Sequence, residues 1–203
     1  MLSNVRSHVQ LREKDFICSP SNCLLSLVKG GNDAALKEPE TVVFKKLEPE
    51  YVDESADIMA EALRDNYITH VEIQMGIASG PDTPSPDAVK IIRSQLADML
   101  SDENACVMIA LDGGKLAGIG IGRIEEEYGN RYGDFWDVVV RPESGGKGIG
   151  SRLIEMIHSF FRERGVKAIY LDVNPNNSRA ISLYGRLGYE TVTHVMRKEL
   201  QPR

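Results

Sequence analysis

Residues 138–153 read VVVRPESGGKGIGSRL, and the order of residue types in this stretch decides the fold. An apolar run ends at Pro142, which supplies no backbone donor to a sheet. Four glycines follow within six positions, and an amphipathic run begins directly behind them. Glycine leaves room for a ligand, and the N–H groups at a helix start attract anions. The pattern predicts a strand, a loop that binds pyrophosphate and a helix, with Arg141, Lys147 and Arg152 adding positive charge.

Two common phosphate-binding motifs do not fit this loop. A Walker A loop needs Ser or Thr after Gly-Lys, and Gly148 follows Lys147 here. A dinucleotide fingerprint counted from Gly146 needs a third glycine where Ser151 stands. The run GIGIG at 118–122 also fails, and we interpret it as a glycine-rich strand that a neighbour or ligand approaches closely. Taken alone, the loop fits equally well with a tight turn that caps a helix.

A second segment, VNPNNSRAISLYGRLGY at 173–189, supplies the context that the loop lacks. Together with the loop, the chain resembles the GNAT superfamily of N-acetyltransferases over roughly residues 41–200. One position departs from the family pattern, because Gly145 stands where members carry Arg or Gln. One side-chain contact to the phosphates is therefore missing. The resemblance rests on Val140, Pro142, Gly145, Gly146, Lys147, Gly148, Ile149 and Gly150, and on Asn177, Ala180, Leu183, Tyr184, Gly188 and Tyr189.

The resemblance implies an α+β fold with three layers, α/β/α. Its sheet is expected to be mixed and mostly antiparallel, with about six to seven strands and a central parallel pair splayed at the acyl-CoA site. We assign residues 41–203 to this domain and residues 1–40 to an N-terminal extension, irregular apart from a short helix near Leu24–Val28. Periodicity predicts strands at 41–47, 106–111, 115–124, 135–140, 168–173 and 191–200, helices at 52–65, 87–100, 148–164 and 178–187, a loop at 76–86 and a turn at 129–133.

The resemblance also implies which residues handle acetyl-CoA. Asp137 is the expected general base, with Asp134 and the cluster Glu125–Glu127 as alternatives, although solvated turn carboxylates are the simpler interpretation of that cluster. Tyr184 is expected to protonate the departing thiolate, because thiols titrate near ~8.5 and phenols near ~10. A bulge near Val138–Val140 would expose a backbone N–H to the oxyanion. The acyl donor is expected to contact Val138, Val139, Val140, Gly145, Gly146, Lys147, Gly148, Ile149, Gly150, Ser151, Asn177 and Tyr184, and Asn177 also to cap a helix.

Composition narrows the other possibilities. The 203 residues carry a formal net charge of −6, which disfavours nucleic acid as a partner. Apolar runs are too short to span a membrane, and the three cysteines and four histidines show no metal-ligand spacing, so we expect no metal. A sparse, odd set of cysteines fits the cytoplasm. The family likeness adds a homodimer as one further option.

These observations predict a transferase that moves an acyl group, most simply acetyl, from acyl-CoA to a primary amine. The acceptor is a small molecule, a lysine or a protein N-terminus, and the acidic charge favours a basic one. A non-catalytic acyl-CoA-binding sensor with the same fold is the alternative, since Gly145 weakens the phosphate motif. A nucleotide-binding protein is disfavoured because the loop lacks the Walker A Ser or Thr.

Overall fold

The structure, a computed structural model, describes residues 42–63, 68–198 and 200. All of them belong to one unit, Glu38–Arg203. The expected extension at 1–40, its helix near Leu24–Val28 and two of the cysteines therefore lie outside the described residues. Within the described part, no helix is both long and apolar enough to cross a membrane.

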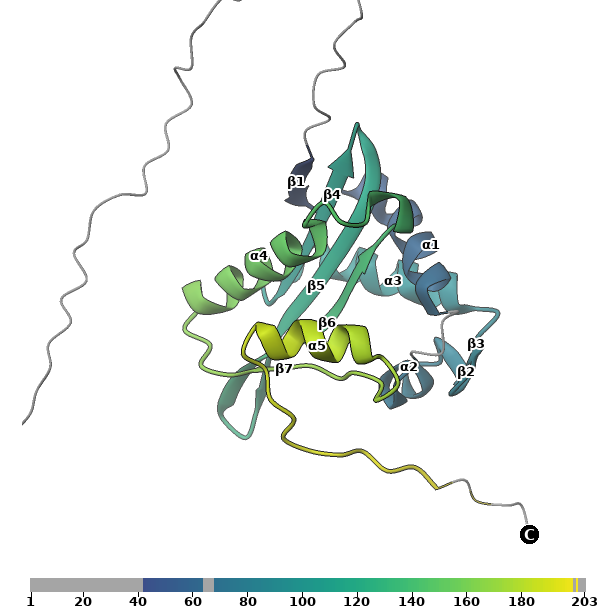
Figure 1. Ribbon diagram of the computed structural model, residues 1–203, viewed down its shortest axis with the longest axis vertical. Coiled ribbons are helices and arrows are strands. Elements are labelled where there is room, and N and C mark those ends of the chain that lie inside the picture. The colour runs from purple at the N-terminus through teal and green to yellow at the C-terminus, as the bar shows by residue number, and fades with distance from the viewer. Residues whose placement is uncertain (1–41, 64–67, 199, 201–203) are drawn as a thin grey trace, which may run out of the picture. The chain divides into compact units, whose positions relative to one another are not determined.

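A five-stranded sheet in the order β1-β4-β5-β6-β7 forms the middle of the unit (Figure 1). Neighbouring strands are antiparallel except for β6 and β7, which are parallel. The expected mixed, mostly antiparallel sheet is thus confirmed. The strands are β1 (Val43–Lys46), β4 (Ala105–Asp112), β5 (Lys115–Glu127), β6 (Asn130–Val140) and β7 (Ile169–Tyr170).

Helices cover both faces of this sheet, which confirms the three layers. On one face, α1 (Val52–Ala62) and α3 (Ala88–Met99) share a core with the alternate strand residues Ile109, Ile119 and Ile121. On the other face, α4 (Ile149–Glu163) packs on the intervening residues of the same strands, such as Met108 and Ala110. Because alternate side chains of each strand point to opposite faces of the sheet, the same strands contribute to two separate hydrophobic cores.

The glycine run in β5 leaves room for the side chains of α4 to pack closely against the sheet. A Cβ built on Gly122 would lie 2.5 Å from the Ile157 side chain and 2.8 Å from that of Phe161. A Cβ on Gly120 would lie 3.0 Å from Ile157. The interpretation of this run as a closely approached strand is confirmed, and the neighbour is a helix.

Several local predictions were wrong at the edges of elements. The turn expected at 129–133 is a two-residue hairpin turn, Tyr128-Gly129, with φ of 51° and 78°, so β6 already begins at Asn130. The expected loop at 76–86 contains a short hairpin of β2 (Ala78–Gly80) and β3 (Thr83–Pro84). Sequence analysis also missed the short helix α2 (His70–Gln74), whose start is fixed by a capping box of Thr69 and Glu72.

The C-terminal part differs most from expectation. Only two residues of the predicted strand 168–173 pair with β6, followed by α5 (Ser178–Arg186). The strand predicted at 191–200 is absent from its described residues, where Val192, Val195 and Met196 are exposed. A strand needs a partner edge, and the two paired residues of β7 offer almost none. Within the part of the chain that the structure describes, the sheet therefore has five strands instead of six or seven, and its parallel pair lies at the edge instead of the centre. The remaining short elements are η1 (Pro49–Tyr51) and η3 (Pro142–Ser144).

Candidate active site

The predicted phosphate loop lies between the end of β6 and the start of α4. Gly146 and Gly148 have φ of 79° and 75°, a conformation that favours glycine and turns the chain into the helix. The first helical bond of this region runs from the N–H of Arg152 to the carbonyl of Gly148. Among the described residues, none accepts a hydrogen bond from the N–H groups of Gly146, Gly148, Ile149, Gly150 or Ser151. This row of donors at a helix start suits a pyrophosphate.

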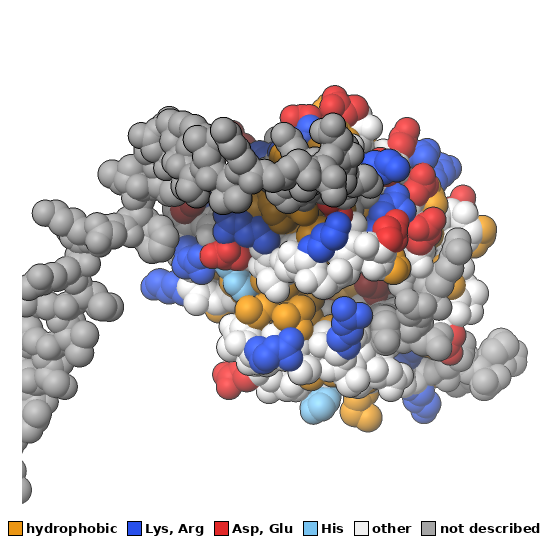
Figure 2. Space-filling model, turned by 45° about the horizontal axis from the view of Figure 1, so that its top comes forward, with side chains coloured by type: hydrophobic (Ala, Val, Ile, Leu, Met, Phe, Trp, Pro, Cys, Tyr) orange, Lys and Arg blue, Asp and Glu red, His pale blue; other side chains and the backbone are white. Residues whose placement is uncertain are grey.

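The basic side chains of this region already have acidic partners. Lys147 donates to the Asp112 carboxylate at 2.6 Å, and Arg152 donates to Glu155 at 2.6 Å. Arg141 binds the carbonyl of Leu116 at 2.9 Å and also pairs with an acid on α1. On the face seen in Figure 2, blue and red side chains are correspondingly interspersed. An anion at the loop would therefore be held mainly by backbone donors and the helix dipole.

Gly145, the position that departs from the family pattern, does not require glycine for its backbone angles. Its φ is −62°, which any L-residue adopts. A Cβ at this position would lie 3.0 Å from the carbonyl oxygen of Pro142, a tight but adjustable contact. The residue is exposed beside the free N–H groups, so a longer side chain here could reach a bound phosphate.

Strand β6 leaves its outer edge open directly before the loop. The parallel pairing with β7 covers only Gly133 and Asp134. The N–H of Arg141 donates to β5, so the N–H groups of Val138 and Val140 point to the opposite, open edge, because alternate residues of a strand point the same way. The expected bulge is present at Trp136, between the pairs Ile121↔Asp137 and Gly122↔Phe135, and not at Val138–Val140.

This bulge determines where the acidic residues of β6 point. In a regular strand, Asp134 and Asp137 would lie on opposite faces, since they are three residues apart. The extra residue at Trp136 restores Asp137 to the face that carries Asp134, the α1 and α3 side. Both carboxylates therefore line one cavity of about 100 Å³, together with Glu72 and Asp172.

Asp137 has the electrostatic properties of a proton acceptor. Burial, followed by the charge of Glu72, raises its pKa to about 7, against the opposing effect of a hydrogen bond from the N–H of Val138. A carboxyl group with a pKa near neutrality can both accept and release a proton under working conditions. The structure thus distinguishes Asp137 from an ordinary solvated carboxylate.

The other candidate bases fall into two groups. Asp134 shares the cavity, and burial raises its pKa to about 6. Glu125 accepts a bond from Arg123 at 2.7 Å, and Glu126 and Glu127 are exposed near the hairpin turn. None of these glutamates lines the cavity. The Glu cluster is therefore a solvated and ion-paired surface feature, as the simpler interpretation held.

Tyr184 on α5 approaches from the opposite face of β6. Its ring packs edge-on against Phe135 at 6.1 Å and against Tyr189 at 5.6 Å. Burial, followed by the charge of Asp137, raises the pKa of Tyr184 well above its usual value. The phenol consequently holds its proton at neutral pH and can serve as a donor. That electrostatic coupling also means that the two predicted catalytic side chains lie near each other across the open edge of β6.

Asn177 has the predicted helix-capping role. Its side-chain oxygen accepts a hydrogen bond of 3.0 Å from the N–H of Ala180 at the start of α5. This cap holds the helix that carries Tyr184. The expected contact of Asn177 with the cofactor stays a prediction.

Sequence analysis missed three groups that shape this region. Glu72 was hidden in a helix that was not expected, although its T-x-x-E capping pattern was readable. Asp172 reaches the cavity only because β7 ends beside β6. Asp112 at the end of β4 accepts from both Lys147 and Ser144, and so anchors the loop to the sheet.

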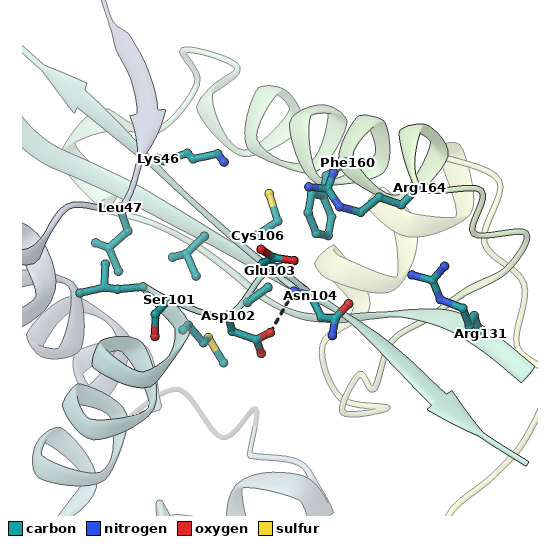
Figure 3. A pocket seen from close by; sticks show the side chains of 14 residues that line it. Lys46, Leu47, Ser101, Asp102, Glu103, Asn104, Cys106, Arg131, Phe160 and Arg164 are labelled. Carbon is teal, nitrogen blue, oxygen red and sulfur yellow. Dashed lines mark hydrogen bonds between the residues drawn. The ribbon is translucent and has the colours of Figure 1, made fainter. Parts of the chain in front are cut away.

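A larger cavity of about 580 Å³ lies elsewhere, around the start of β4 and the end of α4. Figure 3 shows Lys46, Arg164 and Arg131 around it, with Asp102 below. None of the predicted site residues lines it. Asp102 there accepts from Arg123 at 2.9 Å and from a backbone N–H, and these bonds lower its pKa. Its carboxylate is thus fully compensated, in contrast to those of Asp134 and Asp137.

Comparison with known sequences points in one direction. A family model described as acetyltransferase (GNAT) family matches residues 67–189. Mycothiol acetyltransferase of Propionibacterium freudenreichii subsp. shermanii is 30% identical over 101 residues, or 50% of this chain and 32% of that protein. The uncharacterized N-acetyltransferase YobR of Bacillus subtilis is 32% identical over 62 residues, or 30% of this chain and 25% of that protein. The chain thus spans only a quarter to a third of the length of these curated relatives.

Solved structures show the same architecture. The aminoglycoside N-acetyltransferase AAC(6')-Iy in complex with CoA aligns with a TM-score of 0.60 at 14% identity, covering 82% of this chain and 99% of that one. Glucosamine-6-phosphate N-acetyltransferase from Arabidopsis thaliana aligns with a TM-score of 0.55 at 19% identity, covering 80% and 100%. At such identities the likeness establishes the fold alone.

Proposed function

The chain belongs to the acetyltransferase (GNAT) family, and on that premise we propose that it transfers an acyl group, most simply acetyl, from acyl-CoA to a primary amine. One observation carries the proposal. The open edge of β6 runs from the Asp137 and Tyr184 side chains to the row of free N–H groups at the start of α4. An acyl-CoA carries a thioester at one end and a pyrophosphate towards the other. The thioester would lie at Asp137 and Tyr184, and the pyrophosphate at the N–H groups.

The proposed donor is bound mainly through the backbone. The pyrophosphate would accept from the N–H groups of Gly146 and of residues 148–151, with the Lys147 side chain exchanging its partner Asp112 for a phosphate oxygen. The arm that carries the thioester would lie along β6, where the outward N–H groups of Val138 and Val140 lack a strand partner. Asn177 and Tyr184 would flank the arm from α5.

The proposed chemistry is direct attack. The amine loses a proton to Asp137, and its lone pair forms a bond to the thioester carbonyl carbon. The N–H of Val140 is the proposed donor to the resulting oxyanion, because Asp137 already accepts from the N–H of Val138. When the carbon–sulfur bond breaks, Tyr184 gives its proton to the leaving thiolate. The nitrogen gives up its second proton as the amide forms, and this proton restores the Tyr184 phenol, while Asp137 releases its proton to solvent. The products are the amide and the CoA thiol, so atoms and charges balance.

Two measurements test this proposal. Acetyl-CoA should raise the melting temperature, because a ligand at a hundred times its Kd adds about 2.7 kcal/mol of stability, whereas ATP and NAD should have far less effect. A panel of amines with acetyl-CoA should then release free thiol. Stabilisation without thiol release from any amine would instead support the non-catalytic sensor. No stabilisation at millimolar acetyl-CoA would refute both. The cytoplasmic location and the homodimer stay predictions.

A further inference from the structure

The cavity beside Asp137 gathers carboxylates without a cationic side chain in its described lining. Its lining includes four carboxylates, from Glu72, Asp134, Asp137 and Asp172, and no lysine or arginine among the described residues. Glu72 accepts from the N–H and hydroxyl of Thr69, and Asp137 accepts from the N–H of Val138, so these two carboxylates are hydrogen-bonded but not ion-paired. Two basic side chains act from outside this lining: His70 lies 3.9 Å from Asp172, and the charge of Arg123 lowers the pKa of Asp134. Burial raises the pKa of both Asp134 and Asp137, and neighbouring carboxylates act in the same direction, Glu125 and Asp172 on Asp134 and Glu72 on Asp137. A ligand that brings positive charge would relieve the repulsion among these carboxylates.

The four carboxylates are distributed around the cavity instead of converging. They come from α2, from two positions of β6 and from the segment behind β7. Within the described residues, no three acidic, histidine or cysteine side chains are placed to hold one metal ion. Such an arrangement suits positive charges at separate points of one organic molecule. Side chains between them are apolar, including Met59, Leu63 and Trp136.

The size of the cavity limits the shape of that molecule. A volume of about 100 Å³ is well below the roughly 300–1,000 Å³ of drug-sized pockets. An amino sugar with several rings, or a folded protein surface, would not enter it, whereas an unbranched alkyl chain would. Strands rise about 3.3 Å per residue, so Asp134 and Asp137 place their carboxylates within about 10 Å of each other.

On this basis, and resting on the proposed function, we propose that the acyl acceptor is a linear alkyl diamine or polyamine. Its reacting amine lies at Asp137, and its second, protonated nitrogen lies between Asp134 and Asp172. A spacer of about four to six methylene groups joins two nitrogens over this distance and packs against the apolar lining. The far nitrogen keeps its proton during transfer, and only the near one is acylated. Asp134 and Asp172 thus determine specificity.

The test compares pairs of amines that differ only in the second charge. Thiol release from acetyl-CoA is measured with 1,4-diaminobutane against butylamine, and with 1,5-diaminopentane against pentylamine. For the wild type, kcat/KM should be at least about tenfold higher for each diamine, because the second nitrogen gains a charge pair with the partly buried Asp134 and the half-exposed Asp172. The ratio should fall as salt is raised from about 0.05 to 0.5 M.

Three variants locate the second charge. Asp134→Asn and Asp172→Asn should each reduce the diamine-to-monoamine ratio to below about three, mainly through KM. The matched control Glu126→Gln removes an exposed carboxylate outside the cavity and should keep the wild-type ratio. Melting curves with acetyl-CoA establish that each variant is folded.

The outcomes separate this inference from the proposed function. Equal kcat/KM for diamines and monoamines, or a ratio that both cavity variants leave intact, would overturn the inference while acyl transfer itself stands. A preference for a basic peptide over every diamine would do the same. If none of the amines in the panel leads to thiol release, the proposed function is refuted, and the inference is refuted with it.

Discussion

Replacing Asp137 with Asn should make the protein more stable and far less active, and the gain in stability should depend on pH. The carboxyl pKa is raised from 3.8 to about 7 in the folded state by burial and by Glu72. Below about pH 4 the Asp137 carboxyl is protonated in both the folded and the unfolded state, so it does not lower the free energy of unfolding. Between pH 4 and 7 the unfolded state ionises first, so the folded state binds more protons and stability falls as pH rises. Above pH 7 the full cost is present.

The size of this effect follows from the shift. Each pKa unit corresponds to about 1.4 kcal/mol, so the shift sets an upper limit of about 4 kcal/mol, and solvent at the cavity mouth reduces it to about 1–3 kcal/mol. Urea unfolding at pH 4, 6 and 8 measures the difference between Asp137→Asn and wild type. We expect almost no difference at pH 4 and the full gain at pH 8. The exposed control Glu126→Gln should show no such trend.

The activity of the same variant provides an independent check. A general base contributes roughly 10²–10⁴-fold to the rate, so kcat/KM should fall by that factor at pH 8. Ionisation of a group with a pKa of about 7 raises the wild-type rate about tenfold between pH 6 and 8. The ratio of wild-type to variant rates should therefore rise about tenfold between pH 6 and 8. Taking this ratio removes the pH dependence that comes from ionisation of the amine, because both enzymes share it. A variant with wild-type rates, or a stability gain that is equal at pH 4 and 8, would refute the role and the burial of Asp137.

Three further changes test the site and the scaffold. Tyr184→Phe should lower kcat by roughly 10²–10⁴-fold while acetyl-CoA affinity, measured by titration calorimetry, stays near wild type; an unchanged kcat would reassign the proton donor. Gly122→Ala should destabilise the fold by about 1–3 kcal/mol in urea, because its Cβ would meet Ile157 at 2.5 Å, whereas the control Gly185→Ala on α5 has open space and should be neutral or stabilising. Gly145→Arg should bind CoA several-fold more tightly than Gly145→Ala at low salt, with the gap closing at high salt, since φ at this position is −62°; equal affinities would mean that residue 145 does not face the phosphates.

Local sequence patterns were sufficient to predict the elements whose ends are marked by proline or glycine. Pro142 and the glycines that follow it predicted the end of β6, the loop and the start of α4, and each lies where expected. The helical periodicity of residues 52–65, 87–100 and 148–164 likewise predicted α1, α3 and α4. The short elements α2, β2 and β3 were missed, because each is too short to show a periodic apolar pattern. The strand expected at 191–200 has the right composition, but pairing depends on a distant partner edge that composition cannot report.

The sequence alone determined the family, the order of the main elements and the glycine-rich loop before α4, because those depend on local backbone preferences and on motif spacing. The tertiary structure decided the chemistry of the acids. A strand period of two would have separated Asp134 from Asp137, and only the bulge at Trp136 brings both to one cavity. Burial and the approach of Glu72 from a distant helix then raise the pKa of Asp137 to about 7. Such a shift arises from neighbours that are remote in the chain, so no local pattern contains it.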